Sequence, residues 1–481
     1  MICTTASVPV QRKVSARMVV ISSAIDSAWL VEQITGRGAT DVRNSLTALI
    51  ENGELAAGTQ LPTIRDFARV AGISVGTIAD AWSSLRDAGL IETRRRGGST
   101  VADRSSVLVP APRAPAHFPG WAHIDLVQVN ADVALQPALG DALLASLDAP
   151  ELNAPGRDYM TNRLQAAVET HWPFPAEAWA TAGGGTEALL LAISAAAPRG
   201  STVAVDEPVV PGFLDTLNDL GITAVGVSAD THGPTPASLR AALTHNPVAF
   251  VFQPGAPFAI DHTVSVARVA ELAEVIRQHN ARSDGTRVWV IEDDSIGPLA
   301  ARDVPSMGLL LPGQVLRIRS YCKAYGIDVR TSILGGSREL VQRCVQQRSH
   351  GVGSNSRILQ NALAHLIDSP AATQSVDVAR QRYAVRREAL VSALVSEGLR
   401  AYAGHESLVV WIEVDNELDA LVALASQGIS VGSGRKSFVT PPAQGLLRMS
   451  ITQLPDNPEL VAEFARLVAR AATGSLREYF D

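Results

Sequence analysis

The chain has 481 residues, a length that suggests two or three domains rather than one. Hydrophobic residues make up 46% and charged residues 19%, which is typical of a globular protein, and the net charge of −7 means that any contact with nucleic acid must come from a local patch. The three cysteines are too far apart in the sequence to suggest a disulfide framework, and no two histidines have the spacing of metal ligands. No apolar run is long enough to span a membrane. The low cysteine content fits a cytoplasmic protein.

A proline-rich segment, RSSVLVPAPRAPAHFPG, divides the chain. Its prolines fix φ and remove backbone donors, so neither a helix nor a sheet can run through it. We therefore predict an N-terminal extension with an alternative start at Met18, a small domain, a semi-rigid linker and a large domain, over residues 1–37, 38–103, 104–120 and 121–481.

The small domain carries signals for three short helices. Apolar side chains recur at helical spacing over residues 42–50. Thr63 with Asp66 makes a capping box for a second helix, which reaches Gly72. Ser74 caps a third helix whose expected buried stripe is Ile78, Ala81, Trp82 and Leu85. Two short helices joined by a glycine-containing turn are typical of a helix-turn-helix unit.

The segment ETRRRGGSTV follows and predicts a two-stranded ribbon with arginines at its tip. The third helix would enter the DNA major groove by its N-terminal end, and the ribbon arginines would contact phosphates or the minor groove. An arginine triplet alone is usually a solvated loop. The order of three helices followed by an arginine-rich ribbon is much more specific.

This order resembles the winged-helix domain of the GntR family of bacterial repressors, through the segments Leu61-Pro62-Thr63-Ile64-Arg65, Ile73-Ser74-Val75-Gly76-Thr77-Ile78 and Arg95-Arg96-Gly97-Gly98-Ser99-Thr100-Val101. Val75 stands where the family has an arginine, so we expect a different sequence choice or a lower affinity, because valine can only pack. The resemblance implies that DNA is contacted by Arg65, Ser74, Thr77, Arg94, Arg95, Arg96, Gly97 and Gly98.

The large domain alternates short apolar runs with amphipathic stretches. Such runs predict buried strands in a mostly parallel sheet covered on both faces, an α/β fold. Ligands bind beyond the carboxyl ends of the strands in such sheets. The runs are Thr202–Val205, Ala224–Val227, Ala249–Phe252, Val288–Ile291 and Val315–Ile318.

Polar residues follow several of these runs. Gly183-Gly184-Gly185-Thr186 opens a helix whose free amides suit a phosphate, although three glycines are more often a tight turn. Glu292-Asp293-Asp294 fits a metal site, a helix cap or a partner for a protonated ring nitrogen. Lys323 would be a surface residue if it stood alone, but it follows a strand of the same sheet, with Arg330 seven residues later.

Together these elements resemble the active site of fold-type-I aminotransferases, which hold pyridoxal 5′-phosphate. The resemblance implies that a lysine binds the cofactor's aldehyde, a carboxylate holds its ring nitrogen, and amides, a hydroxyl and an arginine hold its phosphate. These roles fall to Lys323, Asp293, and the group Gly185, Thr186, Ser320 and Arg330, while Arg448 matches the arginine that grips a substrate carboxylate.

A winged helix, a proline-rich linker and an aminotransferase-like domain, in that order, are the arrangement of the MocR-type subgroup of GntR regulators. This resemblance implies a cytoplasmic, homodimeric transcription regulator that binds operator DNA. Its large domain would bind pyridoxal 5′-phosphate and sense the cofactor or an amino-acid or amine effector, with no membrane partner.

The cofactor pocket departs from the aminotransferase pattern at five places, so we expect no efficient transamination and assign no catalytic residue. Two alternatives remain: a regulator whose large domain has lost the cofactor, and an aminotransferase with a DNA-binding appendage. The departures are Phe258 for an asparagine, Ser295 for a tyrosine or histidine, Val209-Val210-Pro211 for an aromatic motif, Asn153–Pro155 for a tyrosine motif, and Cys322 for a serine.

Overall fold

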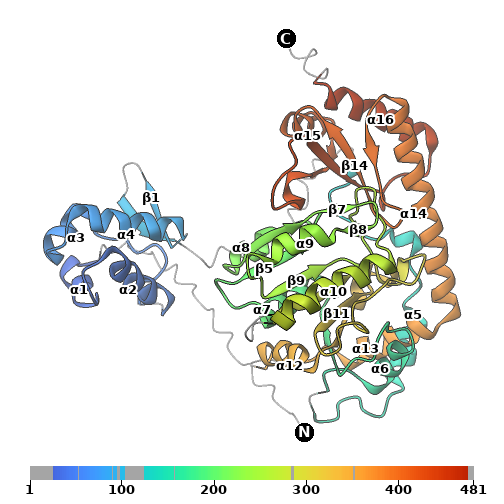
Figure 1. Cartoon of the computed structure of the whole chain (residues 1–481), viewed down its shortest axis with the longest axis horizontal. Coiled ribbons are helices and arrows are strands. Elements are labelled where there is room, and N and C mark those ends of the chain that lie inside the picture. The colour runs from blue at the N-terminus through green and yellow to red at the C-terminus, as the bar shows by residue number, and fades with distance from the viewer. Residues whose placement is uncertain are drawn as a thin grey trace, which may run out of the picture. The chain divides into compact units, whose positions relative to one another are not determined.

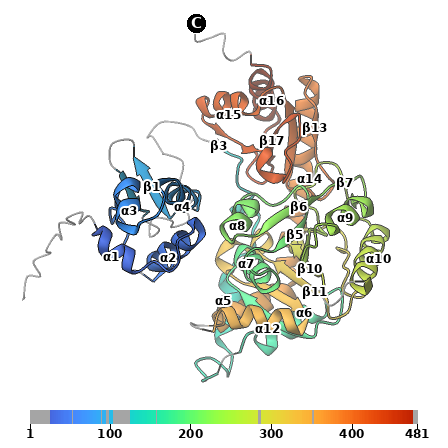
Figure 2. The same ribbon diagram turned by 60° about the vertical axis from the view of Figure 1, so that its left-hand side comes forward.

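The computed structural model describes residues 25–52, 54–88, 90–94, 98–102, 124–156, 158–282, 287–349 and 353–474. The chain divides into two compact units, residues 1–119 and 120–481, coloured blue and teal to red in Figures 1 and 2. The proline-rich segment lies outside the described residues. Each unit is taken by itself below.

The first unit contains the three expected helices. Thr63 accepts a hydrogen bond from the Asp66 amide and Ser74 from the Thr77 amide, so both predicted N-caps are confirmed. Gly72 ends the second helix with a φ of 65°, which glycine adopts without strain. The predicted stripe of Ile78, Ala81, Trp82 and Leu85 is buried. The helices are α2 (Ala39–Glu51), α3 (Ile64–Ala71) and α4 (Val75–Asp87).

A further helix, α1 (Ser27–Glu32), lies in the segment that sequence analysis assigned to the N-terminal extension. Leu30 is fully buried in the same apolar cluster as α2, α3 and α4, so this stretch is part of the domain core. The ribbon is present as β1 (Ile91–Arg94) paired antiparallel with β2 (Gly98–Val101). The predicted contact residues Arg95, Arg96 and Gly97 lie outside the described residues.

The second unit is built on a seven-stranded sheet in the order β4-β12-β11-β10-β9-β5-β6. Neighbours from β11 to β6 pair in parallel, and β12 alone runs antiparallel to both of its neighbours. The predicted mostly parallel sheet is therefore confirmed. The strands are β4 (Ala178–Ala182), β5 (Thr202–Asp206), β6 (Thr223–Val227), β9 (Ala249–Phe252), β10 (Trp289–Asp294), β11 (Val315–Ser320) and β12 (Ser332–Gly336).

Helices cover both faces of this sheet, as Figures 1 and 2 show. Alternate strand residues divide between two apolar clusters, so that Phe250 and Phe252 face one layer and Val251 faces the other. One layer includes α7 (Gly185–Ala196), α8 (Phe213–Asp219) and α12 (Arg338–Gln347), and the other includes α6 (Asn162–Glu169), α9 (Pro236–Leu243), α10 (Val266–Arg282) and α13 (Arg357–Asp368).

The C-terminal part of this unit forms a four-stranded antiparallel sheet in the order β13-β14-β17-β16, with α15 and α16 packed beside it. In Figure 1, the 27-residue helix α14 runs from this sheet along the side of the larger one. No helix among the described residues is both long and apolar enough to cross a membrane. The elements are α14 (Pro370–Ser396), β13 (Ala401–Tyr402), β14 (Val409–Val414), α15 (Glu417–Ser426), β16 (Gly432–Ser433), β17 (Gly445–Ser450) and α16 (Pro458–Ala472).

Short elements complete this unit. They are β3 (Ile124–Asp125), η2 (Val133–Leu135), α5 (Gly140–Leu147), β7 (Ala229–Asp230), β8 (Gly233–Pro234), η3 (Gly297–Leu299), α11 (Cys322–Tyr325), η4 (Ile327–Val329), β15 (Ile429–Ser430) and η5 (Arg435–Ser437). Of these, α11 matters most for the site, because it follows β11 and carries Lys323.

Candidate functional site

Lys323 lies at the carboxyl edge of the large sheet. Its Nζ donates a hydrogen bond to the carbonyl oxygen of Ser295 at 2.9 Å. Ser295 follows β10 and Lys323 follows β11, so this bond joins the ends of two neighbouring strands. The chain has three lysines, at positions 13, 323 and 436, and the other described one, Lys436, is exposed. Lysine is rare in this arginine-rich chain, and sequence analysis did not use that rarity to single out Lys323. In the structure Lys323 is half-buried.

Asp293 is separated from its two acidic neighbours by the alternation of β10. Sequence analysis placed residues 292–294 after the strand, but they are its last three residues, so Asp293 points to the opposite face from Glu292 and Asp294. Burial raises the pKa of Asp293 to about 6, against the attraction of Lys323, which lowers it. A cationic group placed beside this carboxyl would stabilise its ionised form.

Glu292 and Asp294 serve a different purpose, because both bind Arg317 of the neighbouring strand. Arg317 donates to Glu292 at 2.8 Å and to Asp294 at 2.9 Å, and all three side chains are fully buried. Arg319 adds an ion pair to Asp294 at 3.1 Å. Sequence analysis missed this network, although alternating arginines at 317 and 319 opposite alternating acids could have revealed it.

The predicted phosphate residues approach one another around the start of α7. A Cβ added to Gly185 would lie 3.3 Å from Cβ and Oγ of Ser320, so glycine permits the close approach of helix and strand. The first amides of α7 have no partner within the helix, and Thr186 is exposed there. Asn355 donates to the carbonyls of both Ala182 and Arg330, which ties the backbone of Arg330 to the same turn.

Arg330 is exposed and has a φ of 45°. Among the described residues, no hydrogen bond or ion pair joins its guanidinium to Lys323, Asp293 or Ser320. The structure therefore brings the backbone of Arg330 to the predicted site and leaves its side chain in solvent.

Within the part of the chain that the structure describes, Arg448 is a buried cation without an anionic partner. It lies in β17 with 2% of its surface exposed, and Nη2 donates to the Val127 carbonyl at 3.3 Å. Its Nε and Nη1 atoms are buried and make no hydrogen bond. Burial lowers the pKa of Arg448 to about 10. Buried charges are normally paired, so these free donors are suited to an anionic ligand.

Phe258, which replaces the expected asparagine, has a structural place of its own. Its backbone carbonyl accepts a hydrogen bond from Trp411 Nε1 at 2.9 Å, and its ring lies 6.0 Å from the Arg448 guanidinium. The side chain is buried with Val409, Trp411 and Leu446. The departure from the aminotransferase pattern thus exchanges a polar ligand for an apolar surface.

In the first unit, the predicted DNA-contacting residues of the helices lie at helix starts. Ser74 Oγ accepts from the Thr77 amide at 3.1 Å and lies 2.7 Å from Thr77 Oγ1, so the two side chains form one polar cap at the start of α4. Ser74 is exposed, as is Arg65 in the first turn of α3. Val75 is half-exposed beside them, an unusual position for an apolar side chain.

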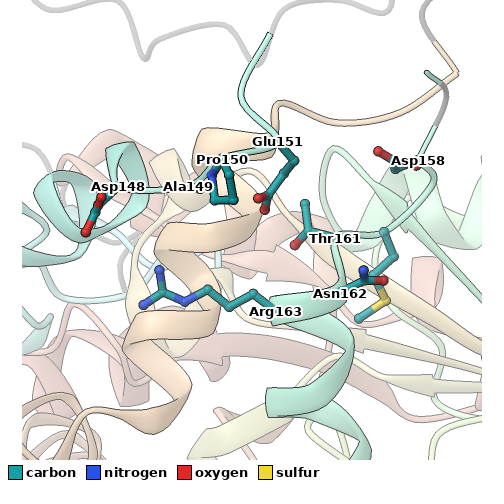
Figure 3. Close-up of a pocket in the computed structure, with 9 residues that line it drawn as sticks. Asp148, Ala149, Pro150, Glu151, Asp158, Thr161, Asn162 and Arg163 are labelled. Carbon is teal, nitrogen blue, oxygen red and sulfur yellow. The ribbon is translucent and has the colours of Figure 1, made fainter. Parts of the chain in front are cut away.

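A separate hollow of about 380 Å³ lies between the segments 148–151 and 158–163 (Figure 3). Asp148, Glu151 and Arg163 line it, and none of the sequence-predicted residues does. Arg357 fastens the adjoining loop by donating to the carbonyls of Glu151 and Ala154. This loop contains residues 153–155, where a tyrosine motif was expected and is missing.

Comparisons with known proteins match both parts of the chain. Residues 152–464 match the family "Aminotransferase class I and II", and residues 39–101 match "Bacterial regulatory proteins, gntR family". The chain is 25% identical over 435 residues to the vitamin B6 salvage pathway transcriptional repressor PtsJ of Salmonella typhimurium, covering 88% of this chain and 96% of that protein. It is 24% identical to the HTH-type transcriptional regulator YdcR of Escherichia coli, covering 80% and 89%.

Solved structures show the same fold for the large domain. The kynurenine aminotransferase of Pyrococcus horikoshii superposes with a TM-score of 0.63 at 16% identity, covering 75% of this chain and 92% of that one. The α-aminoadipate aminotransferase LysN of Thermus thermophilus gives 0.64 at 18% identity, covering 74% and 93%.

Proposed function

The chain belongs to the aminotransferase class I and II family and carries a gntR-type domain, and from this premise we propose that it is a transcription regulator whose large domain binds pyridoxal 5′-phosphate and senses ligands. The relative PtsJ, named as a repressor of vitamin B6 salvage, supports a regulatory rather than a metabolic role. We propose operator DNA as its partner and therefore place the protein in the cytoplasm. The resemblance to MocR-type regulators is the basis for proposing a homodimer.

The observation that carries the cofactor proposal is the pairing of Lys323 with a buried carboxyl at one sheet edge. Asp293 has a pKa raised by burial, and among the described residues Lys323 is the cation that lowers it. A protonated ring nitrogen would supply the missing positive charge. The residues present therefore fit the cofactor. When bound, it would supply an aldehyde that captures amines and a ring that withdraws electrons.

The residues of the chain would bind and orient the cofactor as follows. Asp293 would hold the ring nitrogen, and Lys323, whose Nζ donates to the Ser295 carbonyl, would be the residue that holds the aldehyde group. The start of α7 and Ser320 would hold the phosphate, because free amides and the helix dipole favour an anion there. Arg330 would need a side-chain rotation from solvent to join them.

We propose that transamination is lost or vestigial. Proton transfer and ring alignment in aminotransferases need polar groups around the ring, and Phe258 supplies an apolar surface at one of these places. Val210 stands where an aromatic ring would stack, which removes about 0.5–1.5 kcal/mol of ring binding. A domain that binds the cofactor but turns over slowly is suited to sensing.

Arg448 is the proposed grip on an effector carboxylate. Its two free, buried donors can bind a carboxylate bidentately, which is the geometry that arginine favours. The effector would then set the DNA-bound state through its different affinities for two arrangements of the dimer.

The test is an absorbance titration of the full chain with pyridoxal 5′-phosphate. We expect a visible band that is absent from Lys323→Ala. Borohydride should remove this band and leave the cofactor covalently attached to Lys323. The matched control is Lys436→Ala. Lys436 is exposed, and its ion pair with Asp215 is long, with 3.9 Å between Nζ and the carboxylate oxygen. A wild-type protein that stays colourless in excess cofactor would overturn the cofactor half of the proposal. Steady turnover of amino donors would favour an enzyme instead.

A further inference from the structure

The surroundings of Arg448 are apolar on several sides. Phe258, Val409, Trp411 and Leu446 form a buried cluster, which we call the aromatic cluster, against which Val210, Tyr402 and Phe438 pack among others. The ring of Trp411 meets that of Phe438 edge to face, with centroids 5.8 Å apart. The cluster thus borders the guanidinium with apolar carbon.

The polar atoms of the aromatic cluster's side chains are already in use. Trp411 Nε1 donates to the Phe258 carbonyl, and Tyr402 Oη donates to Glu413 at 2.9 Å. Both hydrogen-bond donors are therefore occupied, so a second carboxylate on a ligand would find no donor among these side chains, and a buried charge without a partner is costly. A methylene group placed there would gain by leaving water.

Gly432 allows the guanidinium of Arg448 to lie close to the backbone of β16. It pairs with Arg448 across β16 and β17, and a Cβ added to it would lie only 2.5 Å from Arg448 Nη2. The guanidinium therefore lies flat against the strand backbone at Gly432. Of its nitrogen atoms, only Nη2 is hydrogen-bonded.

We propose that the effector is a monocarboxylate with an apolar body, whose carboxylate binds Arg448 and whose hydrocarbon part packs on Val210 and Phe438, the partly buried side chains at the edge of the aromatic cluster. This rests on the proposed function, since the cofactor at Lys323 would receive the effector's amine. The proposed ligands are therefore α-amino acids with apolar side chains, and amino acids with a second carboxylate are excluded.

The experiment measures Kd by calorimetry for the series L-alanine, L-2-aminobutyrate, L-norvaline and L-norleucine, with L-aspartate and L-glutamate as polar competitors. The full chain is used with and without pyridoxal 5′-phosphate. We expect affinity to rise about three- to fourfold for each added methylene. Both dicarboxylates should bind at least about tenfold more weakly than norvaline, because their second charge would be buried unpaired.

Variants separate the two halves of the ligand. Phe438→Ser should flatten the methylene series, and Arg448→Lys should weaken every member by a similar factor. Val210→Ser repeats the first test at another half-buried position, in case Phe438→Ser does not fold. Val422→Ser is the control, since Val422 is 62% exposed on α15.

Two outcomes would overturn the proposal: a flat or falling series, or tightest binding by a dicarboxylate. Absence of binding to any acid, with or without cofactor, would also overturn it. Failure of the proposed function is distinguishable, because the protein would then show no cofactor band while calorimetry without cofactor still reports the carboxylate series.

Discussion

Two adjacent carboxyl groups, those of Asp293 and Asp294, are both buried but have opposite electrostatic surroundings. Burial raises the pKa of Asp293 to about 6, because Lys323 only partly offsets the lost hydration. Burial also opposes ionisation of Asp294, but Arg317 and Arg319 outweigh it and lower its pKa. The first carboxyl is left able to gain from a cationic ligand, and the second is committed to the fold.

The raised pKa of Asp293 predicts a stability difference that depends on pH. A carboxyl with a raised pKa contributes stability that is present below its unfolded pKa, near 3.8, and is lost as the pH rises through about 6. Asp293→Asn replaces the carboxyl with a group that does not ionise, so the variant does not lose this stability as the pH rises. We expect the variant to gain about 2 kcal/mol over the wild type between pH 4 and pH 7, measured by urea unfolding without cofactor.

Asp303→Asn is the matched control for this measurement, because Asp303 is an exposed carboxyl in the same unit. It should leave the difference from wild type constant across the same pH range. An Asp293→Asn curve that runs parallel to the wild-type curve would contradict the prediction. Saturating pyridoxal 5′-phosphate should remove most of the wild-type loss, since a ring cation then faces the carboxyl.

At the scale of elements, apolar runs in the sequence predicted strands β5, β6, β9, β10 and β11 well. They gave little indication of β4 and β12. Ala249–Phe252 and Val288–Ile291 are continuous apolar runs because both sheet faces are covered. By contrast, β12 has the sequence SILGG and β4 has AWATA, with small residues that carry little strand signal. The glycines of β12 are there for packing: a Cβ on Gly335 would lie 2.5 Å from the Trp179 ring.

The buried network around Arg317 predicts a large loss of stability when its cation is removed. Arg317→Leu leaves Glu292 and Asp294 buried without this partner, which typically costs about 3–5 kcal/mol. We expect a much lower midpoint of urea unfolding, which circular dichroism would measure. Arg277→Leu is the control, because the ion pair of Arg277 with Glu274 is exposed and such pairs contribute little to stability. Similar losses in both variants would contradict the prediction.

The helix α4 and the ribbon should make different contributions to DNA binding. Arg96→Ala should weaken binding to all sequences and lower the salt slope by about 0.9, as expected for one lost phosphate contact. Thr77→Ala, at the start of α4, should instead change the preference among operator variants. Fluorescence anisotropy across salt concentrations measures both effects.

Arg86→Ala is the control for these variants, because Arg86 is an exposed arginine at the opposite end of α4. It should bind DNA like the wild type. If Arg96→Ala and Thr77→Ala also did so, the assignment of this surface as the DNA reader would be wrong.

At the scale of the whole molecule, Arg448 should link effector binding to DNA binding. Arg448→Met keeps most of the side-chain volume but removes the charge. We expect it to retain dimerisation and operator binding and to lose the response to amino-acid effectors, typically about 1–3 kcal/mol of coupling. It should also raise the urea midpoint, because a buried cation without an anionic partner is removed.

The measurement is operator affinity with and without effector, for wild type and variant. A variant that still responds at the wild-type effector concentration would exclude Arg448 from the effector site. A lowered urea midpoint would instead indicate that the charge has a partner in the folded protein.

The sequence supplied candidate residues for the site, but it carried no signal for their surroundings. Lys323, Asp293 and Gly185 could be found because each follows or precedes a recognisable apolar run. The solvent position of Arg330 could not be foreseen, since it depends on its left-handed backbone conformation and on Asn355, which is distant in sequence. The lack of an anionic partner for Arg448 likewise depends on three-dimensional packing that no local pattern records.

The alternation of β10 restricts how this region can change during evolution. Insertion or deletion of one residue within the strand would turn every later side chain to the other face, and would direct a carboxylate of the Arg317 network toward Lys323 while withdrawing Asp293. A change of two residues would restore the pattern. Gains and losses of sequence in viable descendants should therefore be even-numbered within β10 and unrestricted in the loops around it.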